Sequence, residues 1–175
     1  MPDTSNEGPF KGYPALRRGR VSVSDADYFL TVCARRPCDR LAEPHLRNTI
    51  INRLLGLQAT ALWMVRCAVL MPDHLHLLVT LQGDTSLSDA MRAFKGPLTP
   101  LLRHVGAAWQ PGFYDHRLRS QEDVLPVFLY IFLNPYRAAL CSWDATWAGY
   151  YCAPEDWSWF AGMTRESRPE PEWLR

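Results

Sequence analysis

Lysine, closely spaced cysteine pairs and long hydrophobic runs are scarce or missing in this 175-residue sequence. Lysine occurs only at positions 11 and 95, so almost all of the positive charge is arginine. Arginine suits bidentate contacts to phosphate, and a GC-rich genome produces the same bias. The five cysteines are odd in number and contain no CxxC pair, which favours reduced thiols in a cytoplasmic protein. There is no run of about 18 apolar residues and no signal-peptide pattern, so neither a membrane span nor secretion is expected.

Composition predicts one folded domain between two polar ends. Hydrophobic residues make up 47% of the chain and charged residues 21%, which permits a sizeable core and argues against general disorder. Residues 1–20 are rich in Gly and Pro and end in an arginine-rich run, so we expect a flexible basic arm that is either solvated or in contact with phosphate. Residues 21–160 are expected to form a single domain and residues 161–175 a disordered tail. The net charge of +1 does not by itself indicate a nucleic-acid partner.

Hydrophobic periodicity predicts the element order β-α-β-β-α-β, followed by another helix. The expected strands are 28–33, 61–70, 74–81 and a short one within 108–119. The first expected helix is 43–55. The second is capped by Ser86 or Ser88 and interrupted by prolines before Val105, and the third begins at the capping sequence 120–123. Asn134-Pro135 is expected to break this last helix, and Trp143 to Phe160 to form loops over the core. The fitting fold class is α+β: a ferredoxin-like four-stranded antiparallel sheet with helices on one face, an open second face, and a further helix that carries Tyr130.

The segment Met71 to Leu81 alternates in period two after a turn at Pro72-Asp73. His74 and His76 therefore share one face of the expected strand, opposite a row of leucine and valine side chains. Two imidazoles at this i, i+2 spacing can ligate a metal ion. Two surface histidines on a half-buried strand are the alternative, and the pattern alone allows both.

A second group of polar residues lies on the expected later helix. Tyr130 and Asn134 are four residues apart, so a helix places both on one side, with Arg137 three residues further along if the path continues. A helix over the open sheet face would bring Asn134 to the two histidines as a third ligand, with Tyr130 beside the metal. The alternatives are an amphipathic core tyrosine and an asparagine that caps a helix.

Several ordered motifs resemble the single-tyrosine HUH transposases, and among these the REP-associated tyrosine transposases. The motifs are MPDHLHLLV (71–79), WQ (109–110), FYDH (113–116) and YIFLNPYRAAL (130–140), supported by YFLT (28–31) and WSWF (157–160). The resemblance extends over about residues 17 to 160. The chain departs from the family pattern at Asp73, where asparagine is frequent, at Tyr136, where valine is usual, and at Ala139, where glycine is usual.

The resemblance implies a complete catalytic site. It makes His74 and His76 the HUH metal ligands, Asn134 the third ligand and Tyr130 the nucleophile. Tyr136 is the other candidate nucleophile, and the spacing to Asn134 favours Tyr130. The family uses Mg²⁺ or Mn²⁺, whereas two imidazoles and an amide would equally suit Zn²⁺ or Fe²⁺. The implied reaction cleaves one DNA strand through a 5′-phosphotyrosine, leaves a free 3′-OH, and rejoins DNA ends by the reverse step.

The implied partner is single-stranded or hairpin DNA that contains palindromic repeats, and the implied location is the cytoplasm, in association with the nucleoid. The cationic side chains expected to hold phosphates are Arg17, Arg18, Arg20, Arg92, Lys95 and Arg137. The aromatic residues Trp109, Phe113 and Tyr114 either stack on unpaired bases or pack in the core. Asp115 and His116 keep an open role, and the sequence is compatible with a monomer and with a homodimer.

Two other function classes compete with this interpretation. A hairpin-DNA-binding protein without strand-transfer activity, acting in regulation or repeat organisation, needs no nucleophile beside a metal. The joint presence of the two histidines, Tyr130 and Asn134 therefore favours the enzyme. A zinc hydrolase unrelated to DNA ranks last, because the sequence contains no H-E-x-x-H motif.

Overall fold

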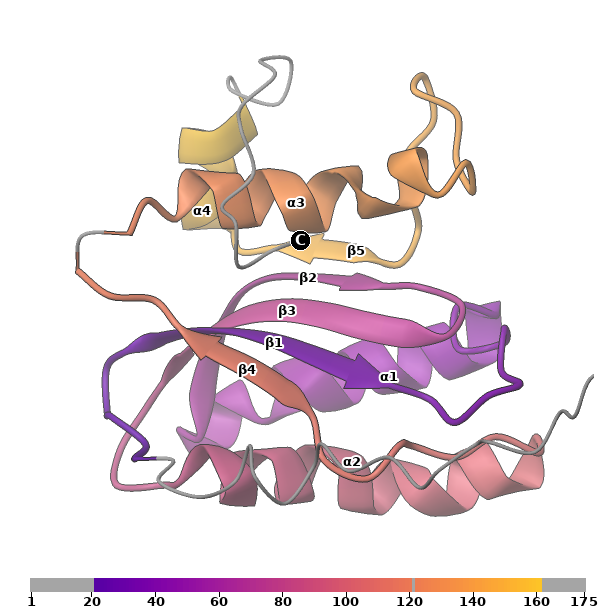
Figure 1. The fold of residues 1–175 in the computed structure, drawn as a ribbon, viewed down its shortest axis with the longest axis horizontal. Helices are drawn as coiled ribbons and strands as arrows, with labels where there is room; N and C mark the ends of the chain where they lie inside the picture. Colours follow the sequence, from indigo (N-terminus) through magenta and orange to yellow (C-terminus); the bar gives the residue numbers. More distant parts are fainter. Residues whose placement is uncertain (1–20, 121, 162–175) are drawn as a thin grey trace, which may run out of the picture.

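Within residues 21–120 and 122–161, which the computed structural model describes, a five-stranded antiparallel sheet and four helices form an α+β fold (Figure 1). The strands are β1 (Asp27–Cys33), β2 (Trp63–Leu70), β3 (His74–Leu81), β4 (Tyr114–Arg117) and β5 (Tyr150–Cys152), in the spatial order β4-β1-β3-β2-β5. The helices are α1 (Pro44–Gly56), α2 (Leu87–His104), α3 (Leu125–Arg137) and α4 (Pro154–Phe160), with a short 3-10 helix, η2, at Gln58–Thr60.

The elements from β1 to β4 follow the order predicted from the sequence. β1 and β3 are the central pair, flanked by β4 and β2, which is the strand order of a ferredoxin-like β-α-β-β-α-β unit. β2 and β3 form the predicted hairpin around Pro72-Asp73, closed by a hydrogen bond of 2.8 Å from Met71 N to His74 O. The hairpin fixes where β3 begins and therefore which side chains face each side of the sheet.

The sheet has a fifth strand, so the expectation of four strands was wrong. β5 lies in the aromatic stretch that was expected to form loops, and it pairs with the outer edge of β2, with Cys67 opposite Cys152. α4 follows β5 directly. A strand of three residues is too short to produce a periodic hydrophobic pattern, whereas its pairing covers a sheet edge that would otherwise be exposed.

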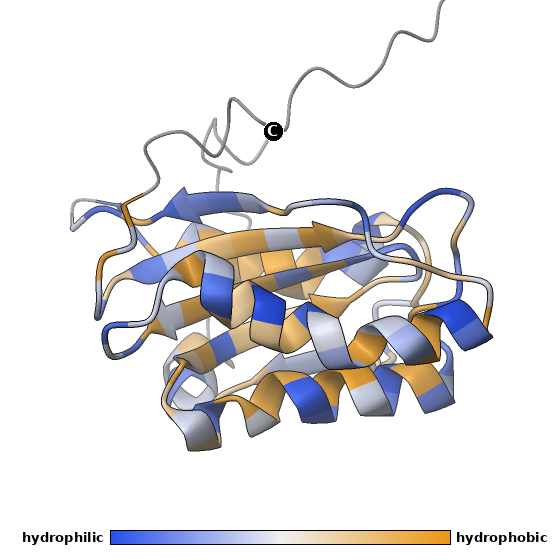
Figure 2. Ribbon diagram, turned by 90° about the horizontal axis from the view of Figure 1, so that it is seen from below, coloured by the Kyte–Doolittle hydropathy of each residue, from blue (hydrophilic) through white to orange (hydrophobic). Residues whose placement is uncertain are grey.

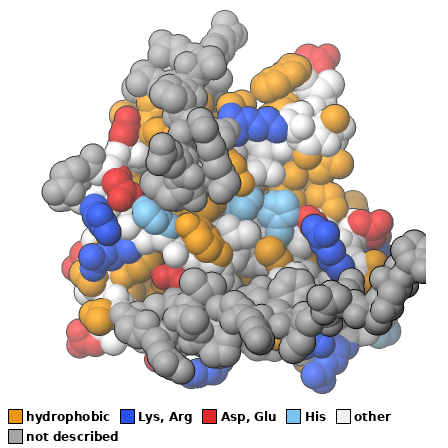
Figure 3. Space-filling model, viewed as in Figure 1, with side chains coloured by type: hydrophobic (Ala, Val, Ile, Leu, Met, Phe, Trp, Pro, Cys, Tyr) orange, Lys and Arg blue, Asp and Glu red, His pale blue; other side chains and the backbone are white. Residues whose placement is uncertain are grey.

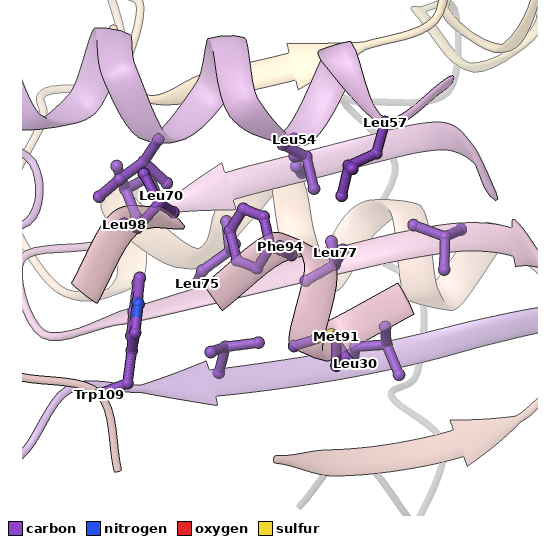
Figure 4. Close-up of a cluster of buried hydrophobic side chains, with 14 of the residues drawn as sticks. Leu30, Leu54, Leu57, Leu70, Leu75, Leu77, Met91, Phe94, Leu98 and Trp109 are labelled. Atoms are coloured by element: carbon purple, nitrogen blue, oxygen red, sulfur yellow. The ribbon is translucent and has the colours of Figure 1, made fainter. Parts of the chain in front are cut away.

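Both faces of the sheet are covered, so the expectation of an open second face was also wrong. Leu30, Leu77 and Phe94 belong to a core between the sheet and α1 and α2 (Figure 4). Figure 2 looks onto these two helices and shows hydrophilic and hydrophobic residues alternating along each, as expected for helices with one buried side. The other face of the sheet contributes Phe29 and Leu78 to a second core beneath α3 and α4. The polar residues of β3 suggested a solvated face, but the neighbouring strands are apolar there.

Proline does not end the helices where breaks were expected. α2 continues through Pro97 and Pro100, and α3 continues through Pro135 to Arg137. A proline inside a helix removes one backbone donor, and the bonds of adjoining turns preserve the path. In α3, Ala138 N donates to Asn134 O at 3.0 Å across the proline. Residues 130–137 of the motif therefore lie on one helix.

The predicted helix starts were partly right. Ser86 caps α2 by accepting a hydrogen bond of 3.1 Å from Asp89 N. α3 begins later than the capping sequence suggested, and Asp123 accepts from Leu125 N at 2.9 Å without a capping box. The expected arm at residues 1–20 and residues 162–175 of the expected tail lie outside the described residues. In the part of the chain that is described, no helix is both long and apolar enough to cross a membrane.

Candidate metal centre and nucleophile

The two histidines of the H-x-H motif lie on the face of β3 that is turned toward α3. His76 is opposite Thr31 of β1 and His74 is opposite Cys33, so the pair lies where β1 ends and β3 begins. The two ring centroids are 4.5 Å apart. Figure 1 shows α3 running above this part of the sheet, and Figure 3 shows imidazole groups in the middle of the same view with lysine or arginine side chains around them.

Each imidazole has a partner at its Nδ1 atom. Thr31 Oγ1 and His76 Nδ1 share a hydrogen bond of 2.9 Å, and Asp73 Oδ1 lies 2.6 Å from His74 Nδ1. Because a carboxylate accepts, the Asp73 contact favours the tautomer of His74 with its proton on Nδ1 and its lone pair on Nε2. Partners of this kind fix the tautomer and the ring orientation of metal-ligating histidines. Thr31 and Asp73 were not among the predicted site residues.

His76 is the more buried of the two, with 6% of its surface exposed. Burial, and to a smaller extent the charge of His74, hold the pKa of His76 well below its ordinary value. The imidazole is therefore neutral at neutral pH, which is the form that can ligate a metal. Phe29 stacks on it with centroids 5.4 Å apart, which places an aromatic wall beside the pair.

Tyr130 projects from α3 onto the same pair. Its phenolic oxygen lies 3.4 Å from His76 Nε2, and the two ring centroids are 5.1 Å apart. The edge-to-face contact with Phe29, at 5.7 Å between centroids, holds the tyrosine ring from the side. Tyr130 as a whole residue is half-buried. The structure therefore places the Tyr130 phenol against His76.

Tyr136, the other candidate nucleophile, has different neighbours. Its hydroxyl donates to Ala145 O at 3.0 Å, and its ring stacks on Trp143. These contacts engage the side chain in the loop that follows α3. The geometry favours Tyr130 as the tyrosine of the site.

Asn134 lies one turn after Tyr130 on the uninterrupted α3 and is half-buried. Arg137 lies almost one further turn along and is exposed, so the three residues share one side of the helix. Among the described residues, no group of three or more His, Cys, Asp and Glu side chains is placed to hold a metal. A metal ion held by the two imidazoles would therefore need a further ligand of another type, and the amide oxygen of Asn134 has suitable chemistry.

Two predicted phosphate contacts lie away from this site. Arg92 and Lys95 belong to α2, which covers the opposite face of the sheet (Figure 1). Arg92 pairs with Asp89 at 2.5 Å, and Lys95 donates to the carbonyl oxygens of Gln110 and Gly112 at 2.8 Å each. These contacts tie α2 to itself and to the loop before β4, and the structure brings neither cation to Tyr130. Three further predicted contacts, Arg17, Arg18 and Arg20, lie outside the described residues.

The aromatic residues of the short fourth strand and its preceding loop divide between core and surface. Trp109 is buried and packs against Phe94 with centroids 6.1 Å apart, which is the core role. Phe113 is half-buried against the same core. Tyr114 is 42% exposed and contacts Phe29 edge-on, so it borders the site. His116, which lies opposite Phe29 on β4, pairs with Glu122 at 2.7 Å.

Comparisons with known proteins find a similar sequence and a similar fold. The sequence is 27% identical to a REP-associated tyrosine transposase of Escherichia coli over 124 residues, which cover 67% of this chain and 71% of that protein. The structure resembles that of a REP-associated tyrosine transposase bound to a REP hairpin, with a TM-score of 0.59 and 24% identity over 70% of this chain and 73% of the other. No protein-family model matches the sequence.

Proposed function

We propose that this chain, a distant homologue of the REP-associated tyrosine transposase of Escherichia coli, is a metal-dependent enzyme that nicks and rejoins single-stranded DNA next to hairpin-forming repeats. The relationship supports a transposase-type function at the level of the family. The hairpin in the structure of the related protein supports the same class of DNA as substrate here. The nicking reaction and the residues that perform it are the proposal.

One observation carries the proposal more than any other. The Tyr130 phenol lies 3.4 Å from His76 Nε2, and the Phe29 ring contacts both side chains. A structural tyrosine on an amphipathic helix would meet apolar side chains in this position. A DNA-binding surface would need no tyrosine beside a pair of imidazoles whose Nδ1 atoms are both engaged.

The residues fit a divalent cation. His74 and His76 would hold it through Nε2, and Asn134 through its amide oxygen, with water and phosphate oxygens completing the shell. We propose Mg²⁺ or Mn²⁺, following the family, because phosphate and amide oxygens suit these hard ions. When bound, the cation supplies polarisation of the scissile phosphate and charge stabilisation for the leaving 3′-oxygen.

The chain itself supplies the nucleophile and its orientation. The Tyr130 oxygen attacks the phosphorus, the bond from phosphorus to the 3′-oxygen breaks, and the downstream fragment stays attached through its 5′-phosphate as a phosphotyrosine. The phenol gives up its proton and the leaving 3′-oxygen takes one up, so the step is balanced. Attack by that 3′-OH, or by another one, on the phosphotyrosine reverses the reaction without an external energy source. Phe29 keeps Tyr130 and His76 in fixed relation during both steps.

Covalent capture of DNA tests the proposal. A 3′-labelled single strand that contains a palindromic hairpin repeat from the encoding genome is incubated with Mn²⁺ or Mg²⁺ and with wild type, Tyr130→Phe or Tyr136→Phe. A 5′-phosphotyrosine retains the labelled downstream fragment on the denatured protein. We expect label on wild type and Tyr136→Phe, and none on Tyr130→Phe or in the presence of a chelator.

Other outcomes are equally informative. Hairpin binding without an adduct in either metal would favour the alternative of a catalytically silent hairpin-binding protein. An adduct that persists in Tyr130→Phe and disappears in Tyr136→Phe would move the nucleophile to the loop end of α3. Hairpin affinity measured for each variant separates loss of chemistry from loss of substrate binding.

A further inference from the structure

The loop between α3 and β5, residues 138–149, carries an aromatic pair that the proposed chemistry does not use. Trp143 stacks on Tyr136 with ring centroids 5.0 Å apart and an angle of 12° between the ring planes. Trp143 is nevertheless 72% exposed, so the ring face turned away from Tyr136 is open to solvent. One exposed hydrophobic residue is ordinary, but a flat ring supported from behind with its outer face open is the geometry on which unpaired bases stack.

The pair is held in place from several sides. The Tyr136 hydroxyl donates to Ala145 O at 3.0 Å, and the Cys141 thiol donates to the same carbonyl at 3.5 Å. The Tyr136 ring also contacts Phe132 of α3, with centroids 5.6 Å apart. These contacts fix the supporting ring before any ligand arrives, which lowers the entropic cost of stacking.

Tyr136 lies further along α3 than the proposed nucleophile and about 120° around the helix axis from it. Tyr136 follows Tyr130 by six residues, a rise of about 9 Å along the helix axis. The exposed Arg137 is adjacent to Tyr136 in the chain and lies on the Tyr130 side of the helix. Asp144, the neighbour of Trp143, is exposed and negatively charged. In the proposed complex the Trp143 ring would contact the base, which is uncharged, and Arg137 would contact the phosphate. The Asp144 carboxylate therefore does not oppose the stacking contact.

We propose that Trp143, supported by Tyr136, is a stacking platform for an unpaired base of the DNA strand beside the scissile phosphate, with Arg137 contacting the strand's phosphate. This inference rests on the proposed DNA-nicking function. It adds a residue outside the metal site that binds an unpaired base of single-stranded DNA. The ligand is a nucleobase because the open surface is one flat ring, in the loop that begins directly after Arg137. A protein partner would require a broader apolar surface.

The test compares two DNA ligands that differ only in an unpaired extension. A blunt hairpin and the same hairpin with a single-stranded 5′ tail containing 2-aminopurine are titrated with wild type, Trp143→Ala and Trp143→Phe. Trp159→Ala is the matched control, since Trp159 is a 42% exposed tryptophan on α4. We expect Trp143→Ala to bind the tailed hairpin about tenfold more weakly, and Trp143→Phe and Trp159→Ala to stay within about threefold of wild type.

The blunt hairpin and the fluorescence complete the test. Affinity for the blunt hairpin should be unchanged in every variant, and quenching of 2-aminopurine should occur with wild type and not with Trp143→Ala. Equal binding of the tailed hairpin by wild type and Trp143→Ala would overturn the platform and leave the nicking proposal intact. An equal loss on both hairpins would also overturn it, because the effect would not depend on an unpaired base. Failure of wild type to bind either DNA would overturn both proposals.

Discussion

The imidazoles of His74 and His76 each contact, through Nδ1, a side chain that is not part of the H-x-H pattern. Asp73 precedes His74 in the chain, so its contact is local. Thr31 meets His76 across the β1–β3 pair, and that meeting depends on the register of two strands separated by more than forty residues. A register of this kind cannot be read from one sequence, which is why the spacing predicted the histidines but not their supports.

Removal of either supporting side chain should weaken metal binding. We expect Thr31→Val and Asp73→Ala to lower the affinity for Mn²⁺ about 10- to 100-fold, because the histidine rings lose their fixed orientation and tautomer. Isothermal titration calorimetry measures this directly. Thr49→Val is the control, since the Thr49 hydroxyl bonds within α1 to His45 O at 3.0 Å. Unchanged affinity in both site variants would remove the case for a metal held by these two histidines.

Ala139 adopts a conformation that suits glycine. Its φ is 54°, in the left-handed region, immediately after the end of α3. Helices commonly end on a residue in this conformation, and a Cβ atom there costs free energy. The sequence motif already marked this position as one where glycine is usual, and the structure supplies the physical reason.

Ala139→Gly should therefore stabilise the protein. We expect the free energy of unfolding to rise by about 0.5–1 kcal/mol, as the relief of strain exceeds the added flexibility of the unfolded chain. Ala138→Gly is the matched control, because Ala138 has a φ of −80° and should lose stability on the same change. Urea unfolding of the two variants gives the comparison. A loss of stability in Ala139→Gly would contradict the assignment of strain.

At the scale of elements, α3 differs from its sequence-based prediction in where the helix ends. Asn134-Pro135 reads as a helix break in the sequence, because proline lacks a backbone donor. In the fold Pro135 is buried and the helix continues to Arg137, so tertiary packing outweighs the local preference. The long strands and helices with clear periodicity were predicted well, whereas β5 and α4, with three and seven residues, were not.

Arg66 links three elements on the α3 side of the sheet. From β2 it reaches Asp27 of β1 at 2.7 Å and Asp156 of α4 at 2.6 Å, and its guanidinium lies over the Phe128 ring at 5.3 Å. Only 19% of its side chain is exposed. The arginine that interrupts the apolar β2 sequence therefore anchors α4, and with it the cover of the second core.

Arg66→Ala should destabilise the protein by about 3 kcal/mol, because two partly buried carboxylates lose their common cation. Chemical denaturation measures the change. Arg92→Ala is the control, since Arg92 is 77% exposed and pairs with Asp89 of its own helix. Its loss should cost less than about 0.5 kcal/mol. Equal effects of the two substitutions would show that the Arg66 network adds nothing to an ordinary surface pair.

At the scale of the whole molecule, two cores enclose one sheet, and the candidate site lies where the second core reaches the surface. The sequence predicted an open face because His74, His76 and Thr80 of β3 are polar. On the same face, β1 supplies Phe29, and β2 supplies Cys67 and Val69, all buried beneath α3 and α4. Hydrophobic periodicity describes the two faces of one strand at a time. Only the assembled sheet shows that the polar residues of β3 have apolar neighbours on the adjacent strands.

A bound cation should stabilise the whole fold, because it links β3 to α3. At a free Mn²⁺ concentration 100 times the dissociation constant, we expect about 2.7 kcal/mol of added stability, seen as a raised thermal midpoint. His76→Ala should lose this increase, whatever its stability in the absence of metal. An increase of the same size in His76→Ala would place the cation at another site.

The most direct measurement of the central claim is to locate the DNA-linked residue. The covalent complex formed with a hairpin-containing single strand and Mn²⁺ is digested with protease and nuclease, and the modified peptide is sequenced by mass spectrometry. We expect a nucleotide on Tyr130, the tyrosine whose oxygen lies 3.4 Å from His76 Nε2. A nucleotide on Tyr136, or no modified peptide with active metal and a bound hairpin, would contradict the assignment of Tyr130 as the nucleophile.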